Sequence, residues 1–316
     1  MDVFVGEPRV GEPRSAGGAA RHGRGHTGIR STLCQCDAMR RLLLPVFMAA
    51  ALLTAGVAPS YGPGGEAARR GASAAGRLAG QVERLEVRVL DVLPHDPQAF
   101  TQGLEVSGRI LYESTGLVGR SSIRASPLGG GPTIRVELPA PLFGEGITVV
   151  GPTLWQLTWR NGIAVQRDAR TLAELRRVPY RDEGWGLCHQ RKRNRLVTSN
   201  GSSRLTFRDP ESLAKTGEVE VTAEGRAVMH LNELECVGDT VYANVLFSDR
   251  IMRIDANTGT VTGEIDAAGL LDAEERPGSA VLNGIAVVPG TDQFLLTGKL
   301  WPKLFRVTFV PRAQRS

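Results

Sequence analysis

Short segments in which apolar and polar residues alternate follow one another through residues 82–310. Examples are TLWQLTW from Thr153, TVYANV from Thr240 and RIMRI from Arg250. Alternation of this kind, rich in β-branched residues, predicts β-strands. Turn-forming residues separate the segments, as in the stretch Asp255–Gly259 and at Asp209-Pro210. We therefore expect an all-β domain over residues 82–310.

A glycine-flanked pattern recurs five times among these segments. The copies are FTQGL from Phe100, FGEGI from Phe143, EGWGL from Glu183, LNELE from Leu231 and VLNGI from Val281. Spacings of 43, 40, 48 and 50 residues result when the anchors are aligned at Gly103, Gly146, Gly186, Leu234 and Gly284. A period of this length predicts a repeat architecture.

Each copy opens a unit of four strand-like segments, which is typical of one blade of a β-propeller. The five copies predict a five-bladed β-propeller with four-stranded blades around a central channel. The last unit lacks a clear fourth strand, and the segment Glu83–Leu93 could complete it. Joining the first and last strands in one blade would close the ring without an exposed edge. A β-sandwich is the competing architecture, but it would not require the same motif five times.

The N-terminal region predicts export. Residues 1–38 form an extension rich in Gly, Arg and Pro, which we interpret as disordered or as a start assigned too far upstream of Met39. Residues 39–60 have the basic start, apolar run and small residues of a signal peptide for the periplasm or for secretion. The apolar run, Leu42 to Val57, is shorter than the roughly 20 residues that a spanning helix needs, although an uncleaved anchor is the alternative. Residues 61–81 are expected to be a linker and 311–316 a tail.

Composition is that of a soluble globular protein, with 41% hydrophobic and 22% charged residues in a chain of 316. Residues 1–60 carry seven arginines against four acidic residues, so they account for +3 of the net charge of +5. The remaining charge gives little reason to expect a polyanionic partner, and we expect no nucleic-acid binding.

The cysteines suggest no disulfide framework. Cys34 and Cys36 precede the expected signal peptide and would be lost with it. Cys188 and Cys236 each lie two residues past an anchor, so we expect buried free thiols on separate strands, with a disulfide as the less favoured alternative. His95, His189 and His230 lack metal-ligand spacing.

The positions just before the anchors are candidates for one shared site, because glycine allows the backbones of inner strands to approach closely. They hold Gln102, Glu145, Trp185, Glu233 and Asn283, and adjoining segments add Trp159, Asn232 and Lys299. Among these, Glu145 is the strongest candidate: a carboxylate in a dehydrated site can have its pKa raised toward neutrality for acid–base chemistry. The alternatives are structural: Glu145 could bind backbone N–H groups, the tryptophans could pack in the core, and Asn232 and Glu233 could form an Asx-type turn.

These motifs resemble one known family. FTQGL, FGEG, GWGL, LNELE and LNGI, together with YESTG from Tyr112, LTW from Leu157, YAN from Tyr242 and TGKLWP from Thr297, occur in the order found in glutaminyl-peptide cyclotransferases of the plant and bacterial type. The resemblance spans about residues 90–308. It implies a five-bladed propeller that converts the N-terminal glutamine of a peptide to pyroglutamate, releases ammonia and needs no catalytic metal.

The resemblance also implies roles for the candidates. The family's candidate catalytic glutamate falls on Glu145. We assign catalytic roles to Glu145, Gln102, Asn232 and Lys299. We assign substrate contacts to Phe100, Trp159, Trp185, Glu233 and Asn283. Glu233 and Asn283 are better explained as architecture. Leu246 stands where the family has a tryptophan, which puts one wall of the substrate pocket in question. The expected partner is a peptide or protein with N-terminal glutamine, bound by a monomer without a stable membrane span.

Two other functions fit the same architecture. An exported propeller could bind peptides without catalysis. A lactonase-like propeller would hold a divalent metal ion, for which Glu145, Glu233 and Asn283 could supply ligands.

Overall fold

A computed structural model describes residues 81–276 and 280–313 of the chain. The expected extension 1–38, the signal peptide 39–60 and residues 61–80 of the linker lie outside the described residues, so those expectations stay predictions. Within the described part, nearly all regular structure is β-strand, and the helical segments are two 3-10 turns, η1 (Arg191–Arg193) and η2 (Ala273–Glu275). None of its helices has the length and apolar character needed to cross a membrane. The all-β prediction is confirmed.

Three antiparallel sheets follow one another along the chain, and each contains four strands in chain order. The first consists of β2 (Thr101–Ser107), β3 (Ile110–Thr115), β4 (Ser122–Pro127) and β5 (Ile134–Glu137). The second consists of β6 (Gly144–Val150), β7 (Thr153–Thr158), β8 (Ile163–Asp168) and β9 (Glu174–Pro179). The third consists of β10 (Leu187–Gln190), β11 (Arg195–Thr198), β12 (Arg204–Arg208) and β13 (Lys215–Glu220). A two-stranded hairpin, β14 (Thr222–Ala223) and β15 (Arg226–Ala227), comes next.

The remaining strands form one eight-stranded sheet in the order β16-β17-β18-β19-β1-β22-β21-β20. One half consists of β16 (Leu231–Val237), β17 (Thr240–Val245), β18 (Arg250–Asp255) and β19 (Val261–Asp266). The other half consists of β20 (Leu282–Val287), β21 (Phe294–Gly298), β22 (Lys303–Pro311) and the first strand of the domain, β1 (Glu83–Pro94). β1 pairs antiparallel with β22 and, over Glu83–Glu86, parallel with β19. The expectation that the first strand joins the last strands is confirmed.

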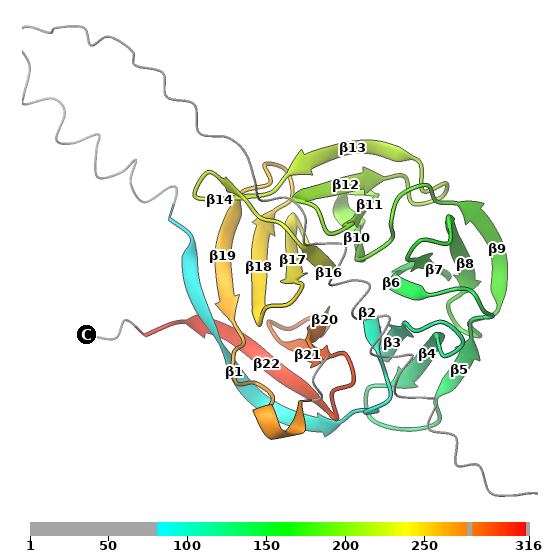
Figure 1. Cartoon of the computed structure of the whole chain (residues 1–316), viewed down its shortest axis with the longest axis horizontal. Helices are drawn as coiled ribbons and strands as arrows, with labels where there is room; N and C mark the ends of the chain where they lie inside the picture. The colour runs from blue at the N-terminus through cyan, green and yellow to red at the C-terminus, as the bar shows by residue number, and fades with distance from the viewer. Residues whose placement is uncertain (1–80, 277–279, 314–316) are drawn as a thin grey trace, which may run out of the picture. The chain divides into compact units, whose positions relative to one another are not determined.

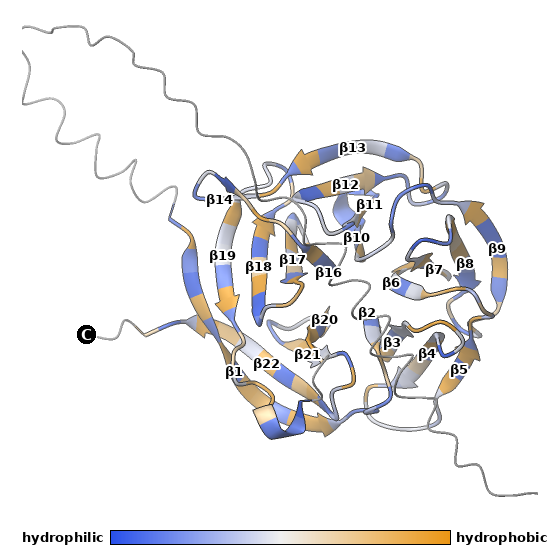
Figure 2. Ribbon diagram, viewed as in Figure 1, coloured by the Kyte–Doolittle hydropathy of each residue, from blue (hydrophilic) through white to orange (hydrophobic). Residues whose placement is uncertain are grey.

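The strands β2, β6, β10, β16 and β20 lie innermost, and the sheets are arranged around a common centre (Figure 1). The inner strands contact one another in the cyclic order β2, β6, β10, β16, β20 and back to β2. These strands are buried along most of their length, whereas the outer strands β5, β9 and β13 are mostly exposed and carry both polar and apolar residues (Figure 2). Hydrophobic clusters fill the space between successive sheets; one of them joins Ile123 of β4 to Leu154 of β7.

A disulfide joins Cys188 of β10 to Cys236 of β16, with a Cα–Cα distance of 5.4 Å. The expectation of two free thiols is therefore wrong. The disulfide forms because these two inner strands contact each other directly, which brings the cysteines within bonding range.

The strand register also corrects the alignment of the fourth copy. In β6, Gly144 and Ile147 flank an irregularity in the pairing with β7. The equivalent pairs are Leu231 and Leu234 in β16, and Leu282 and Ile285 in β20. Asn232 is therefore the equivalent of Glu145 and Asn283, and Glu233 stands where the other copies have glycine. The alignment of Leu234 with the glycines was wrong by one residue.

Candidate active site

The anchoring glycines lie where neighbouring inner strands touch. A Cβ atom added to Gly146 would be 2.5 Å from the carbonyl oxygen of Trp185, and one added to Gly186 would be 2.1 Å from that of Asn232. The Gly146 N–H donates to the Trp185 carbonyl at 2.7 Å. These approaches leave no room for a side chain, so the expectation of close backbone approach is confirmed.

Three of the residues before the glycines are joined by hydrogen bonds. The Gln102 Nε2 donates to Glu145 Oε1 at 3.0 Å, and Asn283 Nδ2 lies 3.4 Å from Gln102 Oε1 and 3.0 Å from the carbonyl oxygen of Thr101. Asn283 thereby orients the Gln102 amide so that its NH₂ group faces Glu145. All three side chains are almost completely buried. The structure thus brings together residues that lie 43 and 181 positions apart in the chain.

Burial raises the pKa of Glu145 well above its ordinary value, because the charged form loses its hydration. The positive charge of Lys299 acts in the opposite direction, and the negative charge of Glu183 raises the pKa further. A carboxyl group whose pKa is raised holds a proton more readily than an ordinary carboxyl group, as a group that accepts and returns a proton must.

Aromatic rings form a continuous wall beside this carboxyl group. Phe100 meets Phe143 edge to face with 6.3 Å between ring centroids, and Phe143 lies 5.6 Å from Trp159. The Lys299 Nζ lies 4.9 Å from the centroid of Phe100. Such a wall can enclose the aliphatic part of a substrate side chain and exclude water.

A second wall is formed by Trp185, whose ring rests on Gly201. A Cβ atom added to Gly201 would lie 2.5 Å from the indole ring, and the positive φ of Gly201, 81°, also favours glycine. The Trp185 Nε1 donates to Glu183 Oε2 at 3.3 Å, and the other oxygen of Glu183 accepts from Arg160. Arg160 in turn stacks on Trp159 at 4.6 Å. This ion pair connects the two aromatic walls.

Two buried donors near these walls have no hydrogen-bond partner within residues 81–276 and 280–313. They are Nδ2 of Asn232 and Nε1 of Trp159. The backbone of Asn232 is fixed, because its carbonyl oxygen accepts from the Ser199 hydroxyl at 2.6 Å. Buried donors are normally satisfied in native proteins, so these two atoms are candidates to bind a substrate oxygen.

Glu233 has a different environment from Glu145. Its two carboxylate oxygens accept backbone N–H groups, from Leu104 of β2 at 3.3 Å and from Ile285 of β20 at 2.7 Å. Burial also raises its pKa well above the ordinary value. The carboxylate therefore ties three inner strands together, which matches the architectural alternative for this residue.

The sequence motifs did not single out Phe143, Arg160 or Glu183 as site residues. Phe143 and Glu183 are the first residues of the motifs FGEGI and EGWGL, and Arg160 directly follows Trp159. Their roles depend on contacts between sheets, and the ion pair of Arg160 with Glu183 spans 23 residues.

Metal-binding clusters are absent from the part of the chain that the structure describes: no three His, Cys, Asp or Glu side chains there are arranged to hold an ion. Both oxygens of Glu233 are also engaged by backbone N–H groups.

Comparisons with known proteins agree with the motifs. The family model for glutamine cyclotransferase matches residues 66–309. The chain is 39% identical over 238 residues to a glutaminyl-peptide cyclotransferase of Arabidopsis thaliana. The match covers 73% of each protein. It is also similar to the crystal structure of Myxococcus xanthus glutaminyl cyclase, with a TM-score of 0.69, 36% identity, and coverage of 74% of this chain and 100% of the other. The chain belongs to the glutamine cyclotransferase family.

Proposed function

We propose that the protein converts the N-terminal glutamine of peptides to pyroglutamate and releases ammonia, with Glu145 as the group that moves the proton. The observation that carries this proposal is a buried carboxyl group of raised pKa, held by Gln102 beside aromatic walls. Membership of the glutamine cyclotransferase family supports the reaction.

The proposal includes a five-bladed propeller as the scaffold. We count the eight-stranded sheet as two blades, β16–β19 and β20–β22 with β1, which the short parallel pairing of β1 with β19 joins into one sheet. The cyclic contacts of the inner strands support this count.

In the proposed reaction, the neutral α-amine of the substrate attacks the carbon of its own γ-carboxamide. A C–N bond forms, the carbonyl oxygen becomes an oxyanion, and ionised Glu145 takes a proton from the attacking nitrogen. Glu145 then gives this proton to the amide nitrogen as the C–N bond to it breaks, so ammonia leaves and the carboxylate is restored. Both reacting groups belong to one residue, so the site must mainly hold the side chain folded onto its amine.

The other site residues position the substrate in this proposal. Gln102 holds one oxygen of Glu145 by a hydrogen bond, and the proton passes through the carboxyl group so held. The Nδ2 group of Asn232 and the charge of Lys299 are suited to stabilise the oxyanion. Trp185, Trp159 and Phe100 enclose the glutamine side chain.

Glu145→Gln tests the proposal. The variant should fold normally and lose ammonia release from an N-terminal glutamine peptide by at least about 10²-fold, because it cannot accept a proton. The control is Glu235→Gln, a buried carboxyl group of raised pKa that binds the backbone of Val287 and should keep its turnover. Near-normal turnover of Glu145→Gln would remove Glu145 from the mechanism.

Two measurements separate the alternatives. Mass spectrometry of the treated peptide should reveal the loss of one ammonia, whereas a binding protein or a lactonase would leave the peptide mass unchanged. We also propose that catalysis needs no metal, so turnover should survive a chelator; loss of activity that zinc restores would contradict this.

Export is proposed as well. The disulfide between Cys188 and Cys236 supports it, because structural disulfides are formed and kept mainly in oxidising compartments.

A further inference from the structure

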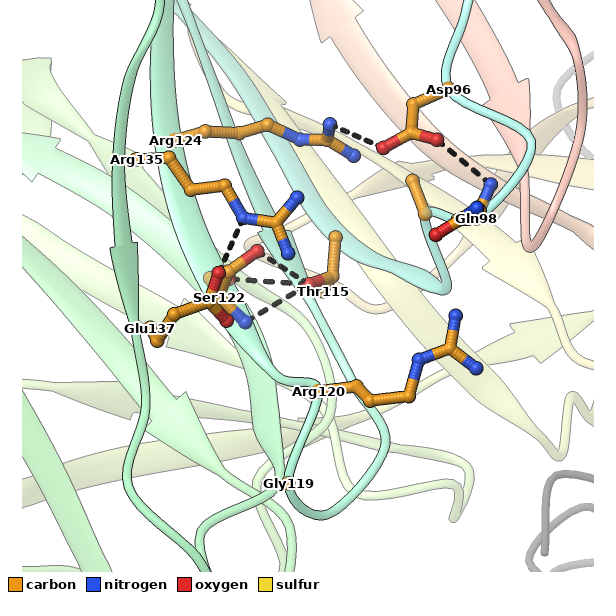
Figure 3. A pocket seen from close by; sticks show the side chains of 10 residues that line it. Asp96, Gln98, Thr115, Gly119, Arg120, Ser122, Arg124, Arg135 and Glu137 are labelled. Atoms are coloured by element: carbon orange, nitrogen blue, oxygen red, sulfur yellow. Dashed lines mark hydrogen bonds and ion pairs between the residues drawn. The ribbon is translucent and has the colours of Figure 1, made fainter. Parts of the chain in front are cut away.

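A cavity of about 280 Å³ lies between the first sheet and the segment Asp96–Ala99 (Figure 3). Its charged lining consists of three arginines and two carboxylates: Arg120, Arg124, Arg135, Asp96 and Glu137. Arg120 belongs to the connection from β3 to β4, while Arg124 and Arg135 lie on β4 and β5. The cavity is thus built from separate elements that bring three guanidinium groups around one space.

The strand register places this cavity at the same level as the candidate active site. Thr101, the neighbour of Gln102, pairs with Thr115, which pairs with Ser122, which pairs with Glu137. The last three of these residues line the cavity. With about 4.8 Å between neighbouring strands, Ser122 lies about 10 Å and Glu137 about 15 Å outward from Thr101.

The three arginines differ in what they bind. Arg124 is held by Asp96 at 3.0 Å and by Glu113 at 2.9 Å, and its side chain is 13% exposed. Arg135 pairs with Glu137 at 2.7 Å, and both side chains are exposed. The exposed side chain of Arg120 makes no hydrogen bond or ion pair with any residue that the structure describes. Arg120 is therefore the guanidinium that an added anion can engage without breaking an existing pair.

We propose that this cavity binds a carboxylate of the substrate peptide, either an acidic side chain at the third or fourth position or the C-terminus of a short peptide. This inference rests on the proposed function, which fixes the N-terminal glutamine near Gln102. An extended peptide advances about 3.3 Å per residue, so its third and fourth residues lie about 7–10 Å from the first. That reach matches the distance to the cavity, where Arg120 can form charge-assisted hydrogen bonds to the carboxylate.

The test compares kcat and KM for peptides that differ only in charge. Gln-Ala-Glu-Ala-amide is compared with Gln-Ala-Gln-Ala-amide, and Gln-Ala-Ala as free acid with its amide. At low salt, the charged member of at least one pair should have a KM about twofold to fivefold lower, since this is the range for exposed ion pairs. The first pair reports an acidic side chain and the second a C-terminal carboxylate.

Two substitutions should act in opposite directions. Arg120→Gln should abolish the preference, whereas Glu137→Gln should increase it by releasing Arg135. Neither substitution should alter kcat for the uncharged peptides, because neither residue contacts the reacting atoms in this proposal. Equal KM values for charged and neutral peptides, or a preference that survives Arg120→Gln, would overturn the cavity assignment. Absence of turnover with every peptide would instead overturn the proposed function and, with it, this inference.

Discussion

Replacing Gln102 by Met should move the acid limb of the pH–rate profile to higher pH. Gln102 is fully buried, and its Nε2 donates to Glu145 Oε1 at 3.0 Å. This bond stabilises the carboxylate more than the carboxylic acid, so its loss favours protonated Glu145. A hydrogen bond to a charged group contributes about 1.5–3 kcal/mol, and one pKa unit corresponds to about 1.4 kcal/mol. The pKa of Glu145 and the acid limb should therefore rise by about 1–2 units.

The assay is kcat/KM for ammonia release, measured from about pH 5 to about pH 9. The matched control is Gln156→Met, another fully buried glutamine, whose amide binds Ser114 and Arg167. The control should lose stability and keep its acid limb. A Gln102→Met enzyme with a lower rate and an unmoved acid limb would refute the reasoning, as would an equal shift in both variants.

Two further predictions concern stability. Burial raises the pKa of Glu105 to about 7 from an ordinary value of 4.5, so its stabilising contribution is complete below about pH 4.5 and is lost as pH rises through 7. In denaturant unfolding, the free energy of unfolding of wild type should fall between pH 5 and pH 8 by about 2.5 kcal/mol more than that of Glu105→Gln; parallel falls would contradict the prediction. Cys236→Ala opens the disulfide to Cys188 and should lower the free energy of unfolding by about 2–4 kcal/mol. Reduced wild type should have the same free energy of unfolding as this variant. A difference between them would show that the lost stability does not come from the disulfide alone.

Much of the fold follows from the sequence because local patterns determine it. Alternation along TVYANV and RIMRI is a property of neighbouring residues, and both segments are strands. The pairing of Glu83–Leu93 with the last strand was predictable too. The last unit of the repeat lacks a fourth strand, and Glu83–Leu93 is an additional strand before the first unit that can complete it and cover its edge.

Features that depend on distances between sheets could not be predicted in this way. The disulfide requires the Cα atoms of Cys188 and Cys236 to lie within bonding range, and only the contact of β10 with β16 decides that. The ion pair of Arg160 with Glu183 likewise joins residues from different segments. Neither residue has a chemistry that distinguishes it, in the sequence, from other surface charges.

The fourth copy of the motif explains why a polar residue at a repeated position was not enough to define the site. Glu233 occupies the place of a glycine, and it shares with Glu145 a buried carboxyl group and a raised pKa. Structural networks also perturb pKa values, so burial and a raised pKa alone do not separate the two residues. The interaction partners of the two carboxyl groups differ. Both oxygens of Glu233 accept backbone N–H groups. Glu145 accepts a hydrogen bond from the side chain of Gln102, and the positive charge of Lys299 lowers its pKa. Because both oxygens of Glu233 are taken by backbone N–H groups of other strands, its carboxyl group serves the scaffold, and the proposed proton transfer is assigned to Glu145.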